Sequence, residues 1–138
     1  MQTSLEDFKV NVRVKLSALW ASTTLCYVYG DYFELYVPGK LQSMLQGHIG
    51  PLGVVSQSVL LGTSIMLAIP STMVALSLLL RPTIARWLNV IFGTIYTLVM
   101  AVVIRGTWSF YVFMGLVEML LTASIVYIAW RWPRTRDA

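Results

Sequence analysis

The chain has 138 residues, of which 57% are hydrophobic and 12% are charged, and its mean hydropathy is +0.72. A soluble domain of this length would have roughly 25% charged residues. The apolar residues form runs too long for core helices, so the composition excludes an ordinary soluble domain and predicts one integral membrane domain over residues 1–138.

The N-terminal arm leads into the first apolar run, at residues 16–36. Residues 4–7 match a capping box. Apolar residues recur three or four apart between Leu5 and Leu19, which predicts an interfacial helix that continues into the span. The valines at 10, 12 and 14 alternate as in a strand, but continuity with the span favours a helix.

The outer loop at 37–53 is the only connection with evident structure. Leu41, Met44 and Leu45 fall on one face of a predicted short helix, between turn-forming proline and glycine residues. This helix could act as a lid on the membrane surface. An amphipathic connector without a gating role is the interpretation that we favour, because loops more often connect than gate.

Three more apolar runs follow, at 54–80, 87–104 and 108–130. A helical span needs about 20 residues to cross about 30 Å of hydrocarbon, so each run is long enough. Pro70 lies inside the second span and removes a backbone hydrogen bond, which predicts a kink. The connections at 81–86 and 105–107 are short, so consecutive helices are antiparallel neighbours. The predicted fold is all-α, an integral membrane four-helix bundle.

Positively charged residues predict the orientation of this bundle. The side that holds both termini carries Lys9, Arg13, Lys15, Arg81, Arg86, Arg131, Arg134 and Arg136. The other side carries only Lys40 and Arg105. Lysine and arginine accumulate on the cytoplasmic side, so both termini are predicted to be cytoplasmic. The same residues explain the net charge of +4, and no nucleic-acid partner is implied.

Glu118 is a carboxylic acid near the middle of the last span. Such a charge costs roughly 2.5–3.5 kcal/mol on insertion scales, and it marks a functional site by default. At 1.5 Å per residue, Glu118 lies ~20 Å above Arg131 and Asp31 lies ~24 Å above Lys15. The two acids can therefore meet in the outer half of the bilayer, with Glu34 on the same face as Asp31.

Three states of this acidic site are physically possible. Glu118 could be protonated, because burial and a second acid both favour the neutral form. It could pair with Arg105, the nearest positive charge, or it could await a cationic ligand beside tyrosine rings. The predicted ligand-binding residues are Glu118, Asp31, Glu34, Tyr27, Tyr96, Tyr111 and Arg105.

Cysteine and histidine are scarce. Cys26 is the single cysteine, so no disulfide or dithiol relay can form within the chain. His48 is the single histidine, which excludes a haem held by two histidines of one chain and disfavours a zinc site. We predict no cofactor and no metal.

The motifs at 16–20, 29–32, 35–39, 115–118 and 130–133 read LSALW, YGDY, LYVPG, GLVE and WRWP. The resemblance that they carry is to a bacterial family of small four-helix membrane proteins of unknown function. It implies a multi-pass protein of the bacterial inner membrane and supplies no activity. More loosely, the layout is similar to DoxX-like proteins and to the sterol-isomerase and sigma-2-receptor group, whose bundles hold acids in a ligand cavity.

Four functions fit these features. The first is binding of a membrane lipid or small amphipathic or cationic molecule in an outward-facing acidic pocket. The second is proton-coupled transport, for which four helices would require a homodimer, so a homo-oligomer is possible. The third is an isomerase-like membrane enzyme with the paired carboxyls as general acid and base. The fourth is a structural or assembly protein whose acids are internally satisfied.

Overall fold

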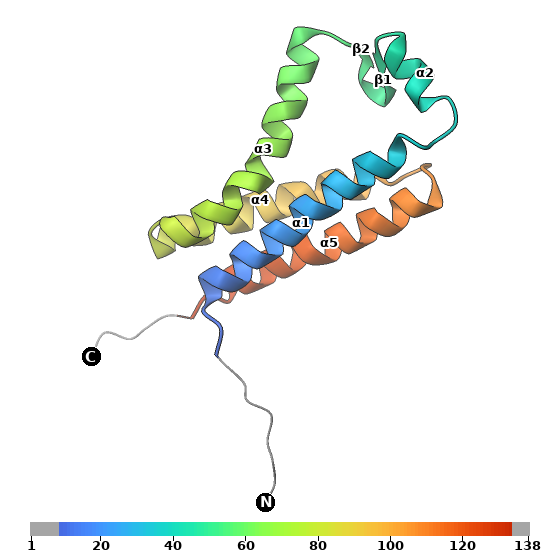
Figure 1. The fold of residues 1–138 in the computed structure, drawn as a ribbon. Helices are drawn as coiled ribbons and strands as arrows, with labels where there is room; N and C mark the ends of the chain where they lie inside the picture. The colour runs from blue at the N-terminus through green and yellow to red at the C-terminus, as the bar shows by residue number, and fades with distance from the viewer. Residues whose placement is uncertain (1–8, 134–138) are drawn as a thin grey trace, which may run out of the picture.

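The computed structural model describes residues 9–133, most of which are helical (Figure 1). The predicted spans correspond to four long helices, α1 (Val12–Glu34), α3 (Gln57–Leu79), α4 (Pro82–Val103) and α5 (Ser109–Trp130). Of these, α3, α4 and α5 are long and apolar enough to cross a membrane, which indicates a membrane protein. α1 is equal in length to α3 but more polar, since it carries charged residues near both ends.

α1 begins at Val12, after the N-terminal arm. The Oδ1 atom of Asn11 accepts a hydrogen bond of 2.9 Å from the backbone N–H of Arg13 and so caps the helix. Val12 and Val14 are helical, as predicted, and Val10 lies before the helix. The predicted capping box at 4–7 lies outside the described residues.

The outer loop contains the predicted short helix and an additional hairpin. The helix is α2 (Lys40–Leu45). It is followed by β1 (His48–Ile49), the 3-10 turn η1 (Gly50–Leu52) and β2 (Gly53–Val54), and the two strands pair antiparallel. Sequence periodicity could not reveal strands of two residues each. Gly50 and Gly53 have φ angles of 36° and 76°, which glycine adopts without steric cost.

α4 begins at Pro82, and not at Trp87 as predicted. Proline suits the first turn of a helix, because its missing N–H would have no partner there. The predicted boundary followed hydrophobicity and therefore omitted this more polar first turn. The connection between α3 and α4 is consequently shorter than the predicted segment 81–86.

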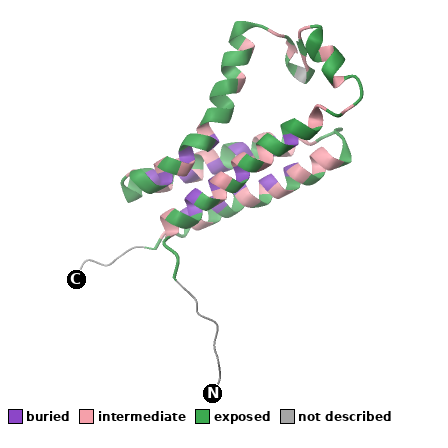
Figure 2. Ribbon diagram, in the orientation of Figure 1, coloured by how far each residue is buried: buried purple, intermediate pink, exposed green. Residues whose placement is uncertain are grey.

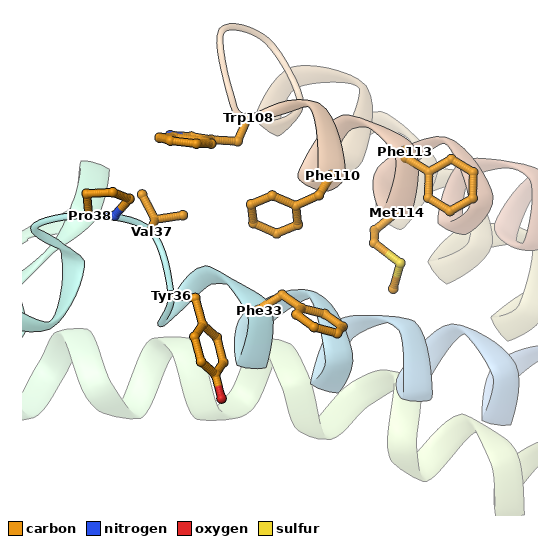
Figure 3. A pocket seen from close by; sticks show the side chains of 8 residues that line it. All are labelled: Phe33, Tyr36, Val37, Pro38, Trp108, Phe110, Phe113 and Met114. Atoms are coloured by element: carbon orange, nitrogen blue, oxygen red, sulfur yellow. The ribbon is translucent and has the colours of Figure 1, made fainter.

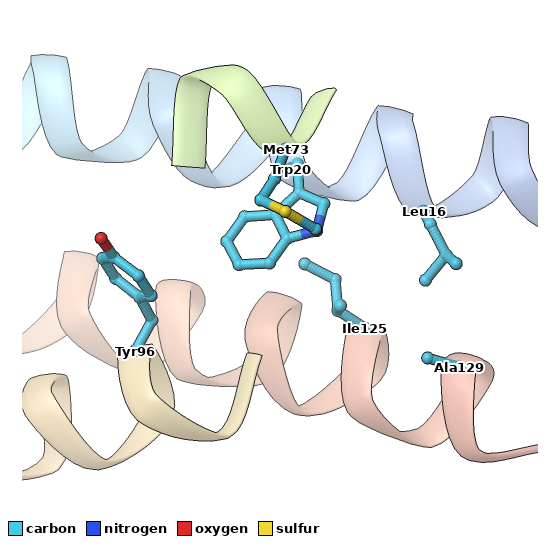
Figure 4. Close-up of a cluster of buried hydrophobic side chains, with 6 residues drawn as sticks. All are labelled: Leu16, Trp20, Met73, Tyr96, Ile125 and Ala129. Atoms are coloured by element: carbon cyan, nitrogen blue, oxygen red, sulfur yellow. The ribbon is translucent and has the colours of Figure 1, made fainter. Parts of the chain in front are cut away.

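The buried core lies where α1, α4, α5 and the second half of α3 meet (Figure 4). Its side chains are those of Leu16, Trp20, Met73, Tyr96, Ile125 and Ala129. Gly93 lets α4 and α5 approach closely, since a Cβ atom there would lie 2.8 Å from Cγ2 of Val126. This close contact supports the helix-packing role of small residues in membrane helices.

A buried hydrogen-bond network joins three of the helices in this core. The Oδ1 atom of Asn89 accepts from Nε1 of Trp20 at 2.7 Å and from Oγ of Ser77 at 3.2 Å. Its Nδ2 atom donates to the carbonyl oxygen of Ala85 at 2.8 Å. α1, α3 and α4 are therefore aligned by one amide side chain that is itself fully buried.

α3 packs against the bundle mainly through its second half. The buried residues of α3 are Pro70, Met73 and Ser77, whereas its first half is mostly exposed (Figure 2). Figure 1 shows that α3 changes direction near its middle and that its first half rises away from α1, α4 and α5. The change of direction agrees with the kink expected at Pro70, which lies inside the helix.

Candidate functional site

Glu118 is buried in the bundle. It lies on α5 with only 3% of its surface exposed. Its Oε2 atom is buried and has no hydrogen-bond partner among residues 9–133. Buried polar atoms are nearly always hydrogen-bonded, and a carboxyl oxygen left without a partner calls for a specific explanation.

Asp31 and Glu118 line the same small cavity from two different helices. α1 contributes Tyr27, Gly30 and Asp31, α4 contributes Met100, and α5 contributes Tyr111, Met114, Gly115 and Glu118. The cavity has a volume of about 10 Å³, which is room for about one water-sized group. Of the described residues, no basic side chain lines it. Asp31 is more exposed than Glu118.

Glu34 lies outside this cavity and is paired with a lysine. Its Oε1 atom accepts a hydrogen bond of 2.6 Å from Nζ of Lys40, which joins the end of α1 to the start of α2. Both residues line a second cavity of about 400 Å³, whose wall includes Tyr111 and Trp108. The charge of Glu34 is therefore compensated, unlike the charge that Glu118 would carry.

A third cavity is apolar and lies between the end of α1 and the start of α5 (Figure 3). Its volume is about 470 Å³, within the range of small-molecule sites. The lining residues are Phe33, Tyr36, Val37, Pro38, Trp108, Phe110, Phe113 and Met114. Met114 is shared with the Glu118 cavity, and Tyr111 joins the Glu118 cavity to the second one. The three cavities are therefore neighbours.

Tyr96 and Arg105, two of the predicted site residues, line none of the three cavities. The hydroxyl of Tyr96 donates to the carbonyl oxygen of Met66, and its ring lies 6.1 Å from that of Tyr27. Arg105 is exposed in the turn between α4 and α5. The structure thus groups Tyr27, Asp31, Tyr111 and Glu118, with Glu34 at an adjoining cavity.

A family model for a family of unknown function, DUF6326, matches residues 4–138. The chain belongs to the DUF6326 family. The resemblance to a family of unknown function is thus confirmed over nearly the whole chain. No curated protein and no solved structure matches this DUF6326 member.

The cavity of this DUF6326 protein restricts the chemistry that its acids can perform. A buried carboxyl group that shares a cavity with a second acid is disfavoured in its charged form unless a cation or a hydrogen-bond donor compensates it. Among the described residues, no group of three or more histidine, cysteine, aspartate or glutamate side chains lies close enough to hold a metal ion. The arrangement suits either a protonated Glu118 or a small cationic group placed between the two acids.

Sequence reasoning missed the apolar wall of the two larger cavities. Phe33, Phe110 and Phe113 lie near the ends of predicted spans, where aromatic residues are expected at the membrane interface in any case. The available signal was that α1 ends and α5 begins on the same side of the bundle. Two clusters of aromatic residues at those ends must then lie near each other.

Proposed function

We propose that this protein is a four-helix bundle of the bacterial inner membrane, with a DoxX-like layout and both termini in the cytoplasm. α1 would be the fourth span, because it is equal in length to α3 and packs against both α3 and α5. The distribution of lysine and arginine supports the orientation, since most of them lie at the end where α1 begins.

Within this bundle, the proposed activity is binding of an amphipathic or cationic small molecule, or a lipid, in an outward-facing acidic pocket. The observation that carries the proposal is the buried Oε2 atom of Glu118, which has no partner among the described residues and faces a cavity shared with Asp31. Charged groups inside membrane proteins face a cavity or a partner and mark ligand or ion sites.

The sizes of the neighbouring cavities suggest which part of such a ligand each cavity would hold. The Glu118 cavity has room for about one water-sized group, so it suits an ammonium group and excludes a bulky head. Tyr27 and Tyr111 line the same cavity and offer ring faces to a cation. The apolar cavity around Phe110 and Phe113 is large enough for a hydrocarbon tail.

The test compares ligands that share a tail but differ in their head. The purified protein in a neutral detergent is heated with decylamine or with decanol, and its melting temperature is measured. We expect decylamine to stabilise the protein more than decanol, because only the ammonium group can pair with Glu118. In the Glu118→Gln variant, decylamine binding should weaken about tenfold or more, since hydrogen bonds to charged groups are worth about 1.5–3 kcal/mol.

Ser124→Ala is the matched control for this experiment. Ser124 is exposed on α5 and bonds only to the carbonyl of Leu120, at 2.7 Å, so its removal leaves the cavity intact. Equal stabilisation by decylamine and decanol, or an unchanged effect of decylamine on Glu118→Gln, would overturn the proposed pocket.

Proton-coupled transport is the second candidate. The change of direction in α3 and its unpacked first half favour it, because broken helices mark the substrate sites of many transporters. Proteoliposomes should then show proton uptake driven by an amine gradient, and Glu118→Gln should abolish it. Absence of any flux from the unmodified protein would exclude this function.

A further inference from the structure

Two further cavities adjoin each other at the end of α1 opposite to the acidic pocket. The larger has a volume of about 530 Å³ and is lined by Asn11, Arg13, Pro82, Thr83, Arg86, Trp132 and Pro133. The smaller has a volume of about 310 Å³ and adds Lys9 to the wall. Asn11, Trp132 and Pro133 line both, so the two cavities adjoin.

Both arginines of the larger cavity are held in place by carbonyl groups at the ends of other helices. Nη1 of Arg13 donates to the carbonyl oxygen of Leu78 in α3 at 3.0 Å. In Arg86, Nε donates to Ala129 and Nη2 to Trp130, both at 3.2 Å, at the end of α5. Within residues 9–133, more than half of the N–H donors of each guanidinium have no hydrogen-bond partner. Anchored side chains lose less conformational entropy when they bind a ligand.

The electrostatics of these cavities favour an anion. Lys9, Arg13 and Arg86 line them, and none of the described lining residues is acidic. The first turn of α4 reaches the same space through Pro82 and Thr83, and it has no side-chain cap. The backbone N–H groups of a helix start add to the attraction for an anion.

The position of the cavities at the ends of three membrane-spanning helices indicates where the anion would come from. α3 ends, α4 begins and α5 ends at this side of the bundle, so the cavities lie at a membrane surface. Trp87 and Trp130 are exposed there, with ring centroids 6.4 Å apart, as is common at a bilayer interface. The anions concentrated at a bilayer surface are the phosphates of lipid headgroups.

We propose that this basic cavity binds the phosphate group of an anionic lipid headgroup through Arg13 and Arg86. Arg13 and Arg86 contact the phosphate oxygens, for which the planar guanidinium is well suited. Lys9 adds charge from the adjoining cavity. The site is independent of the acidic pocket at the other end of the bundle.

The test places a negative charge in the cavity while both arginines remain in the sequence. Thr83 is exposed in the first turn of α4, where a glutamate is favourable to the helix, so Thr83→Glu should fold. Thr83→Gln is the neutral control of the same size. Binding of phosphatidylglycerol and phosphatidylcholine to the full chain is measured by native mass spectrometry in a neutral detergent, and the melting temperature is measured with each lipid.

We expect the unmodified protein and Thr83→Gln to retain phosphatidylglycerol in preference to phosphatidylcholine. Thr83→Glu should bind phosphatidylglycerol about tenfold more weakly, with no change for phosphatidylcholine. Arg81→Gln is a second control, because it removes a positive charge from the same end of the bundle but from none of the lining positions.

A further experiment adds inorganic phosphate to the lipid-free protein. It tests whether the cavity binds a free phosphate ion or only the phosphate of a lipid headgroup. Stabilisation by phosphatidylglycerol alone identifies a lipid site. Stabilisation by phosphate alone keeps the anion site and identifies a soluble source. Equal phosphatidylglycerol binding by Thr83→Glu and Thr83→Gln, or no effect of either anion on the unmodified protein, would overturn the proposal.

Discussion

Glu118 and Asp31 reach one cavity from α5 and α1, and Glu118 keeps a buried oxygen atom without a partner among the described residues. A buried carboxyl oxygen without a partner lowers the stability of the folded protein. A side chain with a purely structural role is not expected to carry this penalty. Sites that bind ligands commonly carry such a cost. The relationship between these two acids therefore leads to a prediction about stability as well as binding.

Replacing Glu118 by methionine should stabilise the ligand-free protein. Methionine has a similar volume and no polar group to desolvate, so it removes the penalty of about 1–3 kcal/mol for a buried polar group without a partner. Glu34→Met is the matched control, because it breaks the contact of 2.6 Å with Lys40 and should not stabilise. The measurement compares the melting temperatures of the two variants and the unmodified protein in detergent. A loss of stability in Glu118→Met would mean that Glu118 has a structural role.

Asn89→Ala should destabilise the bundle by about 2 kcal/mol. The substitution leaves the indole N–H of Trp20 and the hydroxyl of Ser77 without their acceptor in a buried site. Combining it with Trp20→Phe should cost less than the sum of the single changes, because both remove the same bond. Thr94→Ala, which removes an exposed bond within α4, is the control. Additive effects in thermal unfolding would contradict a coupled network.

Gly93→Ala should weaken the packing of α4 on α5. The new Cβ atom would lie 2.8 Å from Cγ2 of Val126, so a side chain or a helix must shift, at a cost of about 1–3 kcal/mol. Val126→Ala in the same chain should restore part of the loss. Gly62→Ala should not destabilise, since its added Cβ meets no atom within 4 Å from other described parts of the chain and alanine favours the helix over glycine. Equal melting temperatures of the two glycine variants would contradict the close approach.

Labelling of introduced cysteines should reveal the orientation. In a Cys26→Ser background, Gln46→Cys should react with a membrane-impermeant maleimide on intact cells, because the outer loop is predicted to face outward. Arg81→Cys should react only after the cells are permeabilised. The reverse pattern would place the termini outside, and the acidic pocket would then open to the cytoplasm.

The positions of the helices, which depend on local sequence, were predicted correctly. The helix that Leu41, Met44 and Leu45 predict forms as α2, and the long helices follow the apolar runs. Boundaries set by hydrophobicity were less accurate, as the early start of α4 at Pro82 shows. The hairpin of β1 and β2 was missed, because strands of two residues have no detectable period.

The predicted site residues were brought together only in part. Tyr27, Asp31, Tyr111 and Glu118 share a cavity, whereas Tyr96 turns its hydroxyl to the carbonyl of Met66. Tyr96 was assigned to the site because its ring could lie beside a cationic ligand. Its actual partner depends on the path of α3, and no local pattern describes that path.

The lengths of the apolar runs and the positions of the charged residues can be read directly from the linear sequence. The sequence by itself therefore determined that this is a helical membrane protein with a buried acid at Glu118. Which side chains meet depends on the rotation of each helix about its axis and on where α3 leaves the bundle. Only tertiary packing decided that Asp31 shares a cavity with Glu118, that Glu34 pairs with Lys40, and that Arg13 and Arg86 line one cavity.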